Sequence, residues 1–560
     1  MQVNRRAFMG GVTLAAGLVS SAQAKTRKSG GAGAQAKALS TLQDCMDQHC
    51  ADWGLPGMTA CMVDSNGFTG FATSGLADVD KKIAVGPDHL FQVGSITKMM
   101  ASLAAWSLID EGKLSPDTRL AELMPELIVR GGEDITLQHL LNHNSGLPNG
   151  APLFLDGGLW TGSKPGTYWA YSNTGYKIAG KIIERIDGRL FPEALEARVL
   201  RPLGMDQSVG ALRKIDRPRY AQGYEPALFD RPHMRPGPLT AAPWVDYDGA
   251  SGCVAATAGD MAIFLRFLIG LAGGKGGAVF SDETAARFMA DPAAAPGWSE
   301  DARYGNGIAH INENDRPYLH HTGGMVSFSS SLHVDPAAGV ACFASSNIHY
   351  AHAYRPRDVS LLGCELLRAA QEGTSFPEAK PSRPVVENPE QFTGLYTAES
   401  GDSFEIIATD GGVALRRDGG AAKMQPVGDN YFACADKVFE ITGLEFETDD
   451  DAVVRVWAGN VEYLAESSAG YLPVVKELQA LEGLYDSDDR WALPTRVYAR
   501  GTRLSAKSAN WGSMLDRADN GDWRPEGDEE SAEWVRFDNI VNGKAERVVG
   551  SGEVSYRRFS

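Results

Sequence analysis

The sequence lacks the signatures of two large hydrolase classes. It holds no Gly-x-Ser-x-Gly string, which marks the nucleophile of α/β-hydrolases, and no His-Glu-x-x-His string, which marks the zinc site of many metalloproteases. Its cysteines do not supply a metal site either, because no pair has the required spacing with histidine nearby. These absences argue against both classes and against a bound zinc ion.

The cysteines are scattered along the chain and odd in number. Cys45 and Cys50 are candidates for a disulfide in an oxidising compartment. However, they lie five residues apart in an expected helix, where their side chains point to different faces. We therefore predict that the cysteines are mostly small buried apolar residues. The seven are Cys45, Cys50, Cys61, Cys253, Cys342, Cys364 and Cys434.

Positive charge and long apolar runs are also scarce. The chain has 53 lysines and arginines against 71 aspartates and glutamates, which gives a formal net charge of −18. Such a surface repels nucleic acid and anionic lipid, so we expect neither as a partner. After the first 24 residues no stretch is long and apolar enough to span a bilayer, and we expect no stable membrane insertion.

The first 24 residues are typical of an export signal. Arg5 and Arg6 precede an apolar stretch rich in glycine and alanine, and Ala22-Gln23-Ala24 fits a small-residue cleavage site. The Arg-Arg-x-Phe pattern resembles twin-arginine leaders, which carry folded proteins across the bacterial inner membrane. We expect a periplasmic or secreted protein, whose mature chain has a net charge of −20 because two arginines are removed.

The length and composition predict several folded domains. A chain of 560 residues is too long for one core, and 43% hydrophobic with 22% charged residues is typical of globular proteins. Residues 25–37 are rich in Gly, Ala and Lys and predict a flexible tether. Helices and strands mix from 38 to 374, which predicts an α+β domain. Four prolines mark 375–389 as a linker.

The chain beyond the linker has an all-β character. Short alternating runs are separated there by Gly and Asp turns. A weak repeat divides this tail, because Phe392-Thr-Gly-Leu-Tyr396 recurs 89 residues later as Leu481-Glu-Gly-Leu-Tyr485. We infer two β-barrel or sandwich modules, 390–473 and 474–560.

Hydrophobic spacing locates several elements of the first domain. An amphipathic helix is expected near 38–53, and 58–63 is expected to pair with 67–73 as two strands. From Ser95 to Glu111 apolar residues recur at three and four positions, which predicts a helix.

Ser95 and Lys98 form a Ser-x-x-Lys string at the start of that helix. Serine is a poor nucleophile without a base in reach, and positions three apart share a helix face. A buried or cation-flanked lysine can be neutral near pH 7 and take the serine proton. Helix entry also leaves the N–H of Ser95 unpaired, which favours developing negative charge. Alone, such a string is expected by chance.

The Tyr171-Ser-Asn173 string supplies a second proton-transfer group. Tyr171 is a candidate base, or a relay that passes the proton to a leaving nitrogen. A cation such as Lys98 would lower the pKa of its hydroxyl. Asn173 can donate to a substrate carbonyl and contact Lys98. Both Lys98 and Tyr171 stand as candidates for the main base.

His321-Thr-Gly323-Gly324 precedes an alternating run, 326–333, that predicts a strand. Glycine at 323 and 324 would let a ligand backbone lie against the strand edge. The N–H groups of Gly324 and Ser95 are the candidate oxyanion hole. His321 is a candidate substrate-binding residue that titrates near neutrality and is often uncharged.

These three motifs, 76 and then 150 residues apart, resemble the active-site motifs of the serine β-lactamase and penicillin-binding-protein superfamily, in its class C-like branch. The resemblance covers about residues 40–370 and implies an antiparallel sheet flanked by helices, with an all-α subregion. It implies Ser95, Lys98 and Tyr171 as catalytic residues. Substrate would be bound by Asn173, His321, Gly323 and Gly324. His143 and Ser145 mimic a dyad, and we take them as scaffold.

The C-terminal part of the chain narrows the resemblance to one group of enzymes within this superfamily. A His-x-Gly third motif followed by two β modules is similar to the D-amino-acid-specific aminopeptidases, whose tails carry two antiparallel β-barrels. In those enzymes a loop from the last module enters the active site and limits substrate size. Here the Asp486–Asp489 turn is in position to offer a carboxylate to a substrate ammonium. The relatives with a lysine in place of His321 use it to attract a substrate carboxylate. The histidine in this chain therefore argues against a β-lactam substrate.

The sequence therefore predicts an exported serine peptidase or amidase that works through an acyl-enzyme at Ser95. The expected substrates are small peptides containing D-residues, cleaved in the manner of a D-aminopeptidase or by trimming linearised non-ribosomal peptides. This mechanism requires no cofactor. A carboxylesterase or an accessory class C-like β-lactamase is the alternative, because the same Ser-Lys-Tyr set cleaves esters. A non-catalytic binder of cell-wall polymer is a third possibility, against which the full catalytic set argues.

Overall fold

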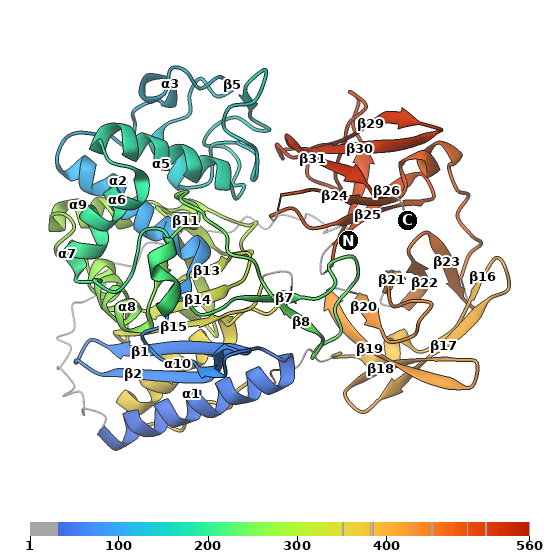
Figure 1. Ribbon diagram of the computed structural model, residues 1–560, viewed down its shortest axis with the longest axis horizontal. Coiled ribbons are helices and arrows are strands. Elements are labelled where there is room, and N and C mark those ends of the chain that lie inside the picture. The colour runs from blue at the N-terminus through green and yellow to red at the C-terminus, as the bar shows by residue number, and fades with distance from the viewer. Residues whose placement is uncertain are drawn as a thin grey trace, which may run out of the picture.

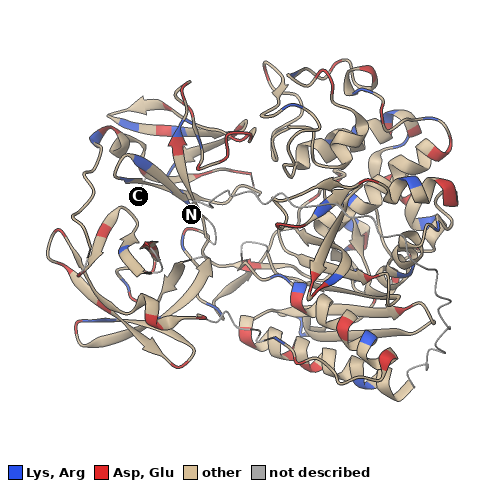
Figure 2. Cartoon of the chain, turned by 180° about the vertical axis from the view of Figure 1, so that it is seen from behind, with Lys and Arg blue, Asp and Glu red and all other residues tan. Residues whose placement is uncertain are grey.

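The computed structural model describes residues 32–349, 352–380, 382, 386–428, 430–449, 452–466, 468–489, 491–509 and 512–558. An α+β domain lies beside two β-barrels (Figure 1). Acidic and basic side chains are spread over both parts (Figure 2). Within the described ranges no helix has the length and apolar character needed to cross a membrane. The expected leader, 1–24, lies outside these ranges, so export stays a prediction.

An antiparallel sheet is the framework of the α+β domain. Its strands follow the order β10-β11-β12-β13-β14-β15-β1-β2-β3. Every residue of β1 is buried, because helices cover both faces of the sheet at this strand. The strands are β1 (Gly57–Asp64), β2 (Thr69–Asp78), β3 (Ile83–Ala84), β10 (Ala293–Ala294), β11 (Arg303–Gly305), β12 (Ile308–Glu313), β13 (Arg316–Gly324), β14 (Ser329–Asp335) and β15 (Val340–Ser346).

Helices form a layer on each face of this sheet. α1 and α10 pack together on one face against β2, β14 and β15, whereas α8 packs on the other face against β1 and β15. The helices are α1 (Ala32–Trp53), α2 (Thr97–Asp110), α3 (Leu120–Leu123), α4 (Leu137–Leu141), α5 (Asn173–Asp187), α6 (Phe191–Leu195), α7 (Arg201–Leu203), α8 (Ala258–Ala272), α9 (Asp282–Met289) and α10 (Arg357–Glu372). Three small pairs complete the domain: β4 (Phe91–Gln92) with β9 (Ala255–Ala256), β5 (Val129–Arg130) with β6 (Leu159–Trp160), and β7 (Tyr224–Pro226) with β8 (Leu239–Ala241).

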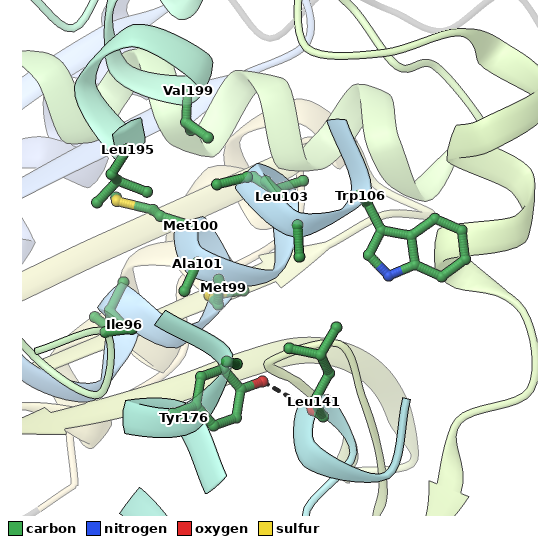
Figure 3. Packing of buried hydrophobic residues seen from close by; sticks show 14 of the residues in the cluster. Ile96, Met99, Met100, Ala101, Leu103, Trp106, Leu141, Tyr176, Leu195 and Val199 are labelled. Carbon is green, nitrogen blue, oxygen red and sulfur yellow. Dashed lines mark hydrogen bonds between the residues drawn. The ribbon is translucent and has the colours of Figure 1, made fainter. Parts of the chain in front are cut away.

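Helix α2 runs through the centre of the larger core. All of its residues except Asp110 are buried, so it is enclosed on every side rather than along one stripe. Met100 and Leu103 lie beside Leu195 and Val199, in α6 and the residues that follow it, while Tyr176 of α5 lies on the other side of the helix (Figure 3). This enclosure fixes the helix that carries Lys98.

Two expected elements are shifted in the structure. α1 begins at Ala32, so the predicted tether is wrong for residues 32–37, where three alanines favour helix once the buried side of α1 is packed. The His321-Thr-Gly323-Gly324 string is itself the end of strand β13 and does not precede a strand at 326. Met325 N donates to Phe328 O at 2.8 Å in a turn, which delays the next strand to Ser329.

Other expectations for this domain are confirmed. Strands β1 and β2 pair antiparallel, and the helix expected from Ser95 is a 3₁₀ turn, Gly94–Ile96, that continues into α2. All seven cysteines lie in the described ranges; all are free, and all but Cys50 are buried. Six of them are small apolar residues in or against the cores of this domain, and Cys434 belongs to the core of the first barrel.

The tail consists of two closed barrels, which confirms the two predicted β modules. In each barrel the first strand pairs with the last, β16 with β23 and β24 with β31. Apolar side chains fill both interiors. The strands are β16 (Gly394–Ala398), β17 (Ser403–Thr409), β18 (Gly412–Arg417), β19 (Gly420–Gly428), β20 (Tyr431–Cys434), β21 (Leu444–Asp449), β22 (Ala452–Ala458), β23 (Val461–Ala465), β24 (Gly483–Asp486), β25 (Thr495–Arg500), β26 (Arg503–Lys507), β27 (Gly512–Arg517), β28 (Trp523–Pro525), β29 (Val535–Val541), β30 (Lys544–Gly550) and β31 (Glu553–Arg557).

The sequence repeat has a structural meaning. In each copy a 3₁₀ turn leads into the first strand of a barrel, and the tyrosine hydroxyl donates back to the carbonyl four residues earlier. Tyr396 Oη donates to Phe392 O at 2.8 Å, and Tyr485 Oη donates to Leu481 O at 2.8 Å. The repeated residues therefore fix the entry of the chain into each barrel.

Both barrels contact the α+β domain. The Gln425 side chain accepts from Arg235 N at 2.6 Å and donates to Arg235 O at 3.0 Å, so the first barrel holds the loop between β7 and β8. The second barrel contacts the loops before α5, where Trp160 Nε1 donates to Ala532 O at 2.8 Å and Tyr168 Oη donates to Asp528 at 3.0 Å. These contacts place the second barrel next to α5.

Removing either repeat hydroxyl should loosen only the barrel that contains it. Tyr396→Phe and Tyr485→Phe each delete a buried hydrogen bond, and we expect the mutated barrel to lose about 1–2 kcal/mol of opening free energy. Amide hydrogen exchange followed by mass spectrometry measures each barrel separately. Tyr556→Phe, whose side chain is 57% exposed, is the control. Unchanged protection in both barrels would contradict this role.

Candidate active site

The three sequence motifs meet at one pocket between the α+β domain and the second barrel. The pocket has a volume of about 520 Å³. Among its lining residues are Ser95, Tyr171, Asn173, Gly323 and Gly324. Lys98 is completely buried beneath Ser95. Residues far apart in the sequence therefore converge on the serine as the motifs predicted.

The backbone around Ser95 is clamped by its neighbours. Val93 N donates to Val254 O at 3.0 Å, and Val254 N donates to Thr97 Oγ1 at 3.1 Å. Gly94 adopts a φ of +55°, and a methyl group at this position would lie 2.7 Å from Gly324 N. Only glycine allows both this conformation and this approach. The approach brings the Gly324 amide next to Ser95, which supports these two amides as the oxyanion hole.

Lys98 is held by three uncharged acceptors. Its Nζ donates to Ser95 Oγ at 3.0 Å, to Asn173 Oδ1 at 2.8 Å and to the Ser251 carbonyl at 2.7 Å. Burial, and secondarily the charge of Lys177, lower the Lys98 pKa well below that of free lysine. A neutral amine 3.0 Å from Ser95 Oγ can accept the serine proton, which favours Lys98 as the base.

Tyr171 and Ser95 both line the pocket. Although part of the Tyr171 side chain faces the pocket, burial raises the pKa of the hydroxyl above its usual value. The expected lowering is therefore wrong in direction, because the loss of solvation on burial outweighs the influence of the neighbouring groups. A protonated Tyr171 is suited to relay a proton rather than to act as the resting base.

Asn173 is fixed at both ends of its amide. Oδ1 accepts from Lys98, and Nδ2 donates to Asn149 Oδ1 at 2.9 Å. Asn173 is the first residue of α5, and Ser172 caps this helix by accepting from Gly175 N at 3.0 Å. The second Nδ2 hydrogen is left for a substrate carbonyl.

His321 does not line the pocket, which corrects its expected role in binding substrate. Its side chain is completely buried, with Nδ1 donating to Thr322 O at 2.5 Å and Nε2 accepting from Tyr304 Oη at 2.9 Å. Burial and the nearby Lys98 lower the His321 pKa to about 3. The ring is a neutral support behind Tyr171 and Trp298, and Thr322 faces the pocket in its place.

Gly323 has a packing role in addition to lining the pocket. A methyl group here would lie 1.9 Å from Val93 O and 2.4 Å from Ser330 Oγ, which itself donates to Val93 O at 2.7 Å. The missing side chain thus makes room for the turn that carries Ser95. Gly324 follows along the same strand edge and lines the pocket.

His143 and Ser145 form no dyad, in line with their assignment to the scaffold. His143 Nδ1 accepts from Ser172 N at 3.1 Å, and its ring centroid lies 4.3 Å from that of Tyr171. Ser145 Oγ accepts from Leu147 N at 3.4 Å. Both side chains are buried, and His143 supports the Tyr171-Ser172-Asn173 segment from behind.

Several pocket residues were missed by the sequence reasoning. Lys177 stands one helical turn after Asn173, so helix periodicity was a usable indication. Ser251 acts through its backbone carbonyl, which no side-chain motif reveals. The second barrel contributes Asp489, from the predicted acidic turn, together with Trp491 and Glu553. The other missed lining residues are Asn149, Gly150, Tyr247, Gly252, Trp298, Met325 and Arg355.

Comparison with known proteins agrees with this geometry. Residues 42–363 match the family model described as Beta-lactamase. The chain is 30% identical over 352 residues to penicillin-binding protein 4 of Amycolatopsis lactamdurans, an alignment that covers 59% of this chain and 90% of that protein. It is 26% identical over 341 residues to the unguisins hydrolase ungD' of Aspergillus campestris, covering 54% of this chain and 60% of that one. The octameric penicillin-binding protein homologue from Pyrococcus abyssi shares the fold, with a TM-score of 0.55 and 21% identity over 76% of this chain and 99% of that chain.

Labelling by an uncharged serine-reactive phosphonate should report the state of Lys98. We expect wild-type Ser95 to be labelled at a rate that rises with pH as Lys98 loses its proton, with a midpoint well below the 10.5 of free lysine. Ser95→Ala should abolish labelling, and Lys98→Met should slow it by about a thousandfold or more. Intact-protein mass spectrometry measures the rates. Lys181→Met, at an exposed position of α5, is the control; wild-type rates in Lys98→Met would refute the assignment.

Gly323→Ala should damage the site without removing a functional group. The added methyl group collides with Val93 O, so the turn that carries Ser95 must shift. We expect the phosphonate labelling rate to fall at least about tenfold and the melting temperature to fall as well. Gly470→Ala, at an exposed position between the two barrels where nothing lies within 4 Å of the added methyl group, is the comparison for a glycine substitution elsewhere. An unaltered labelling rate would contradict the packing role of Gly323.

Proposed function

The chain belongs to the β-lactamase family of serine hydrolases, and we propose that it is an exported peptidase or amidase acting on short peptides with a free amino end, including peptides with D-residues. The observation that carries the proposal is the pairing of an acyl-transfer site with carboxylates from the second barrel at the pocket rim. The amide specificity and the role of the carboxylates each have a separate test.

The reaction proceeds in two acyl-transfer steps. Ser95 Oγ attacks the scissile carbonyl carbon while Lys98 Nζ accepts the serine proton, and the carbonyl oxygen becomes an oxyanion between the amides of Ser95 and Gly324. When the C–N bond breaks, the proton passes from Lys98 through the Tyr171 hydroxyl to the leaving nitrogen. Water then attacks the acyl-enzyme, giving its proton to Lys98, and Ser95 is released with its proton restored.

The second barrel supplies the charges that favour an amine-bearing substrate. Asp489 and Glu553 both stand at the pocket rim, exposed in part to solvent. Partial burial, followed by the nearby charge of Asp489, raises the Glu553 pKa. Two carboxylates that repel one another are stabilised by a cation placed between them. A substrate ammonium is such a cation.

The same barrel limits the length of substrate that can enter. Trp491 contacts Tyr247 with ring centroids 5.4 Å apart and the rings tilted, and both line the pocket. This agrees with the aminopeptidase-like plan of a His-x-Gly motif followed by two barrels, from which the preference for D-residues is taken. The relatives named as a penicillin-binding protein and an unguisins hydrolase support hydrolytic or acylation chemistry on the shared domain.

The discriminating experiment is a mass-spectrometric digest of a defined peptide pool. The pool contains D- and L-residues at the first position, each with a free and an acetylated amino end, beside matched esters and a Ser95→Ala control. We expect cleavage of free-amine peptides that begin with a D-residue. Cleavage next to internal D-residues would favour trimming of longer peptides. If only the esters are cleaved, and the Ser95→Ala control does not cleave them, the proposed peptidase function is wrong and the protein is a carboxylesterase.

The role of the rim carboxylates has a separate test. Because both side chains are partly exposed, Glu553→Gln and Asp489→Asn should each lower kcat/KM for a free-amine substrate by about three- to tenfold at low salt. The acetylated counterpart should be unaffected. Glu529→Gln, an exposed carboxylate on the same barrel, is the matched control. An equal loss on free and acetylated substrates would refute ammonium recognition.

A further inference from the structure

The charge on Lys98 has no anionic counterpart at hydrogen-bond distance. The three acceptors of its Nζ are a hydroxyl, an amide oxygen and a backbone carbonyl. The titratable groups that surround it are also uncharged: the rings of Tyr171 and Tyr176 lie 4.8 and 5.5 Å from Nζ, and His143 and His321 are buried with lowered pKa values. These neutral oxygens and ring faces solvate an ammonium in part, but none of them carries the negative charge that would offset its burial.

Lys177 of α5 and Arg355 each add a cation to the pocket lining, and Lys177 is the one that bears on Lys98. Lys177 follows Asn173 by one helical turn, so both residues face the same pocket, and Asn173 is in direct contact with Lys98. Lys177 is the charge that acts on Lys98 after burial, and it disfavours the protonated form. His321, at the start of the third motif, adds no charge to the site, because it is neutral and buried.

A carboxylate from the second barrel faces this lysine. Glu553 begins β31 and reaches the Asn149–Gly150 loop, where a methyl group on Gly150 would lie 3.2 Å from Glu553 Oε1. Lys177 favours the ionised form of Glu553, whereas Asp489 and Glu533 oppose it. Glu553 therefore offsets part of the positive potential that Lys177 exerts on the pocket.

We propose that Lys177 is the second cation of this active site, a positioning residue that keeps Lys98 in its proton-accepting form, and that Glu553 of the second barrel limits this effect. The proposal rests on Ser95 being the nucleophile of the proposed function. It assigns the barrel a part in the acid–base chemistry as well as in substrate selection. This cation comes from helix α5 rather than from the edge of strand β13, which carries His321.

The test is the pH dependence of Ser95 labelling by the uncharged phosphonate, which needs no knowledge of the substrate. Lys177→Met removes the repulsion, so Lys98 holds its proton more tightly and the midpoint should rise by about 0.5–1 pH unit. Lys177→Arg keeps the charge and should keep the midpoint. Glu553→Gln removes the offsetting charge and should lower the midpoint by about 0.3 pH unit at low salt. Lys181→Met should leave the midpoint unchanged.

Each outcome has one meaning. A wild-type midpoint in Lys177→Met overturns the proposal. So does a variant that loses only turnover of substrates bearing a carboxylate, because Lys177 would then be a substrate-binding residue. Opposite shifts in Lys177→Met and Glu553→Gln, with melting temperatures near that of the wild type, support it. If Ser95 is not labelled in the wild type at any pH, the proposed function itself fails, and this is distinct from labelling with an unshifted profile.

Discussion

The burial of the Lys98 ammonium group among neutral acceptors is the constraint on which the site depends. Its three hydrogen bonds join the start of α2, the start of α5 and the loop at Ser251. Those segments come from distant parts of the chain, so the interaction that positions the base also holds the pocket together. Placing an amine in this position costs stability, because its charged form is poorly solvated there. The same cost lowers the pKa of the amine and so favours its proton-accepting form.

Close contacts between backbone segments position the turn that carries the nucleophile. Gly94 and Gly323 let strand β13 lie directly against the turn that carries Ser95, and the carbonyl of Val93 sits in the space that a side chain at 323 would take. Rigid backbone dipoles of this kind stabilise an oxyanion without reorganising during the reaction. Tyr171, His143 and His321 form the second layer, in which buried aromatic and imidazole rings hold the relay hydroxyl in place.

The sequence was a reliable guide where function follows local spacing, and a poor one where it follows burial. Ser95 and Lys98 share a helix face, and the tail repeat marks the entry to each barrel, so both could be predicted. The protonation of Tyr171 and the enclosure of His321 depend on what packs around them, and no local pattern carries that information. Glu553 is brought to the pocket only by the docking of the second barrel, which a single motif cannot reveal.

The position of Glu553 near the end of the chain has a consequence for assembly. The α+β domain is synthesised first, and its Ser95–Lys98 pair can form before the barrels exist. The rim of the pocket is completed only when β31, the last strand, has closed its barrel against β24. During translation Ser95 is therefore in place before the rim residues that select the substrate. A truncated chain would have the nucleophile but would lack this selectivity. A route that moves only finished, folded molecules across a membrane would deliver the enzyme with both in place.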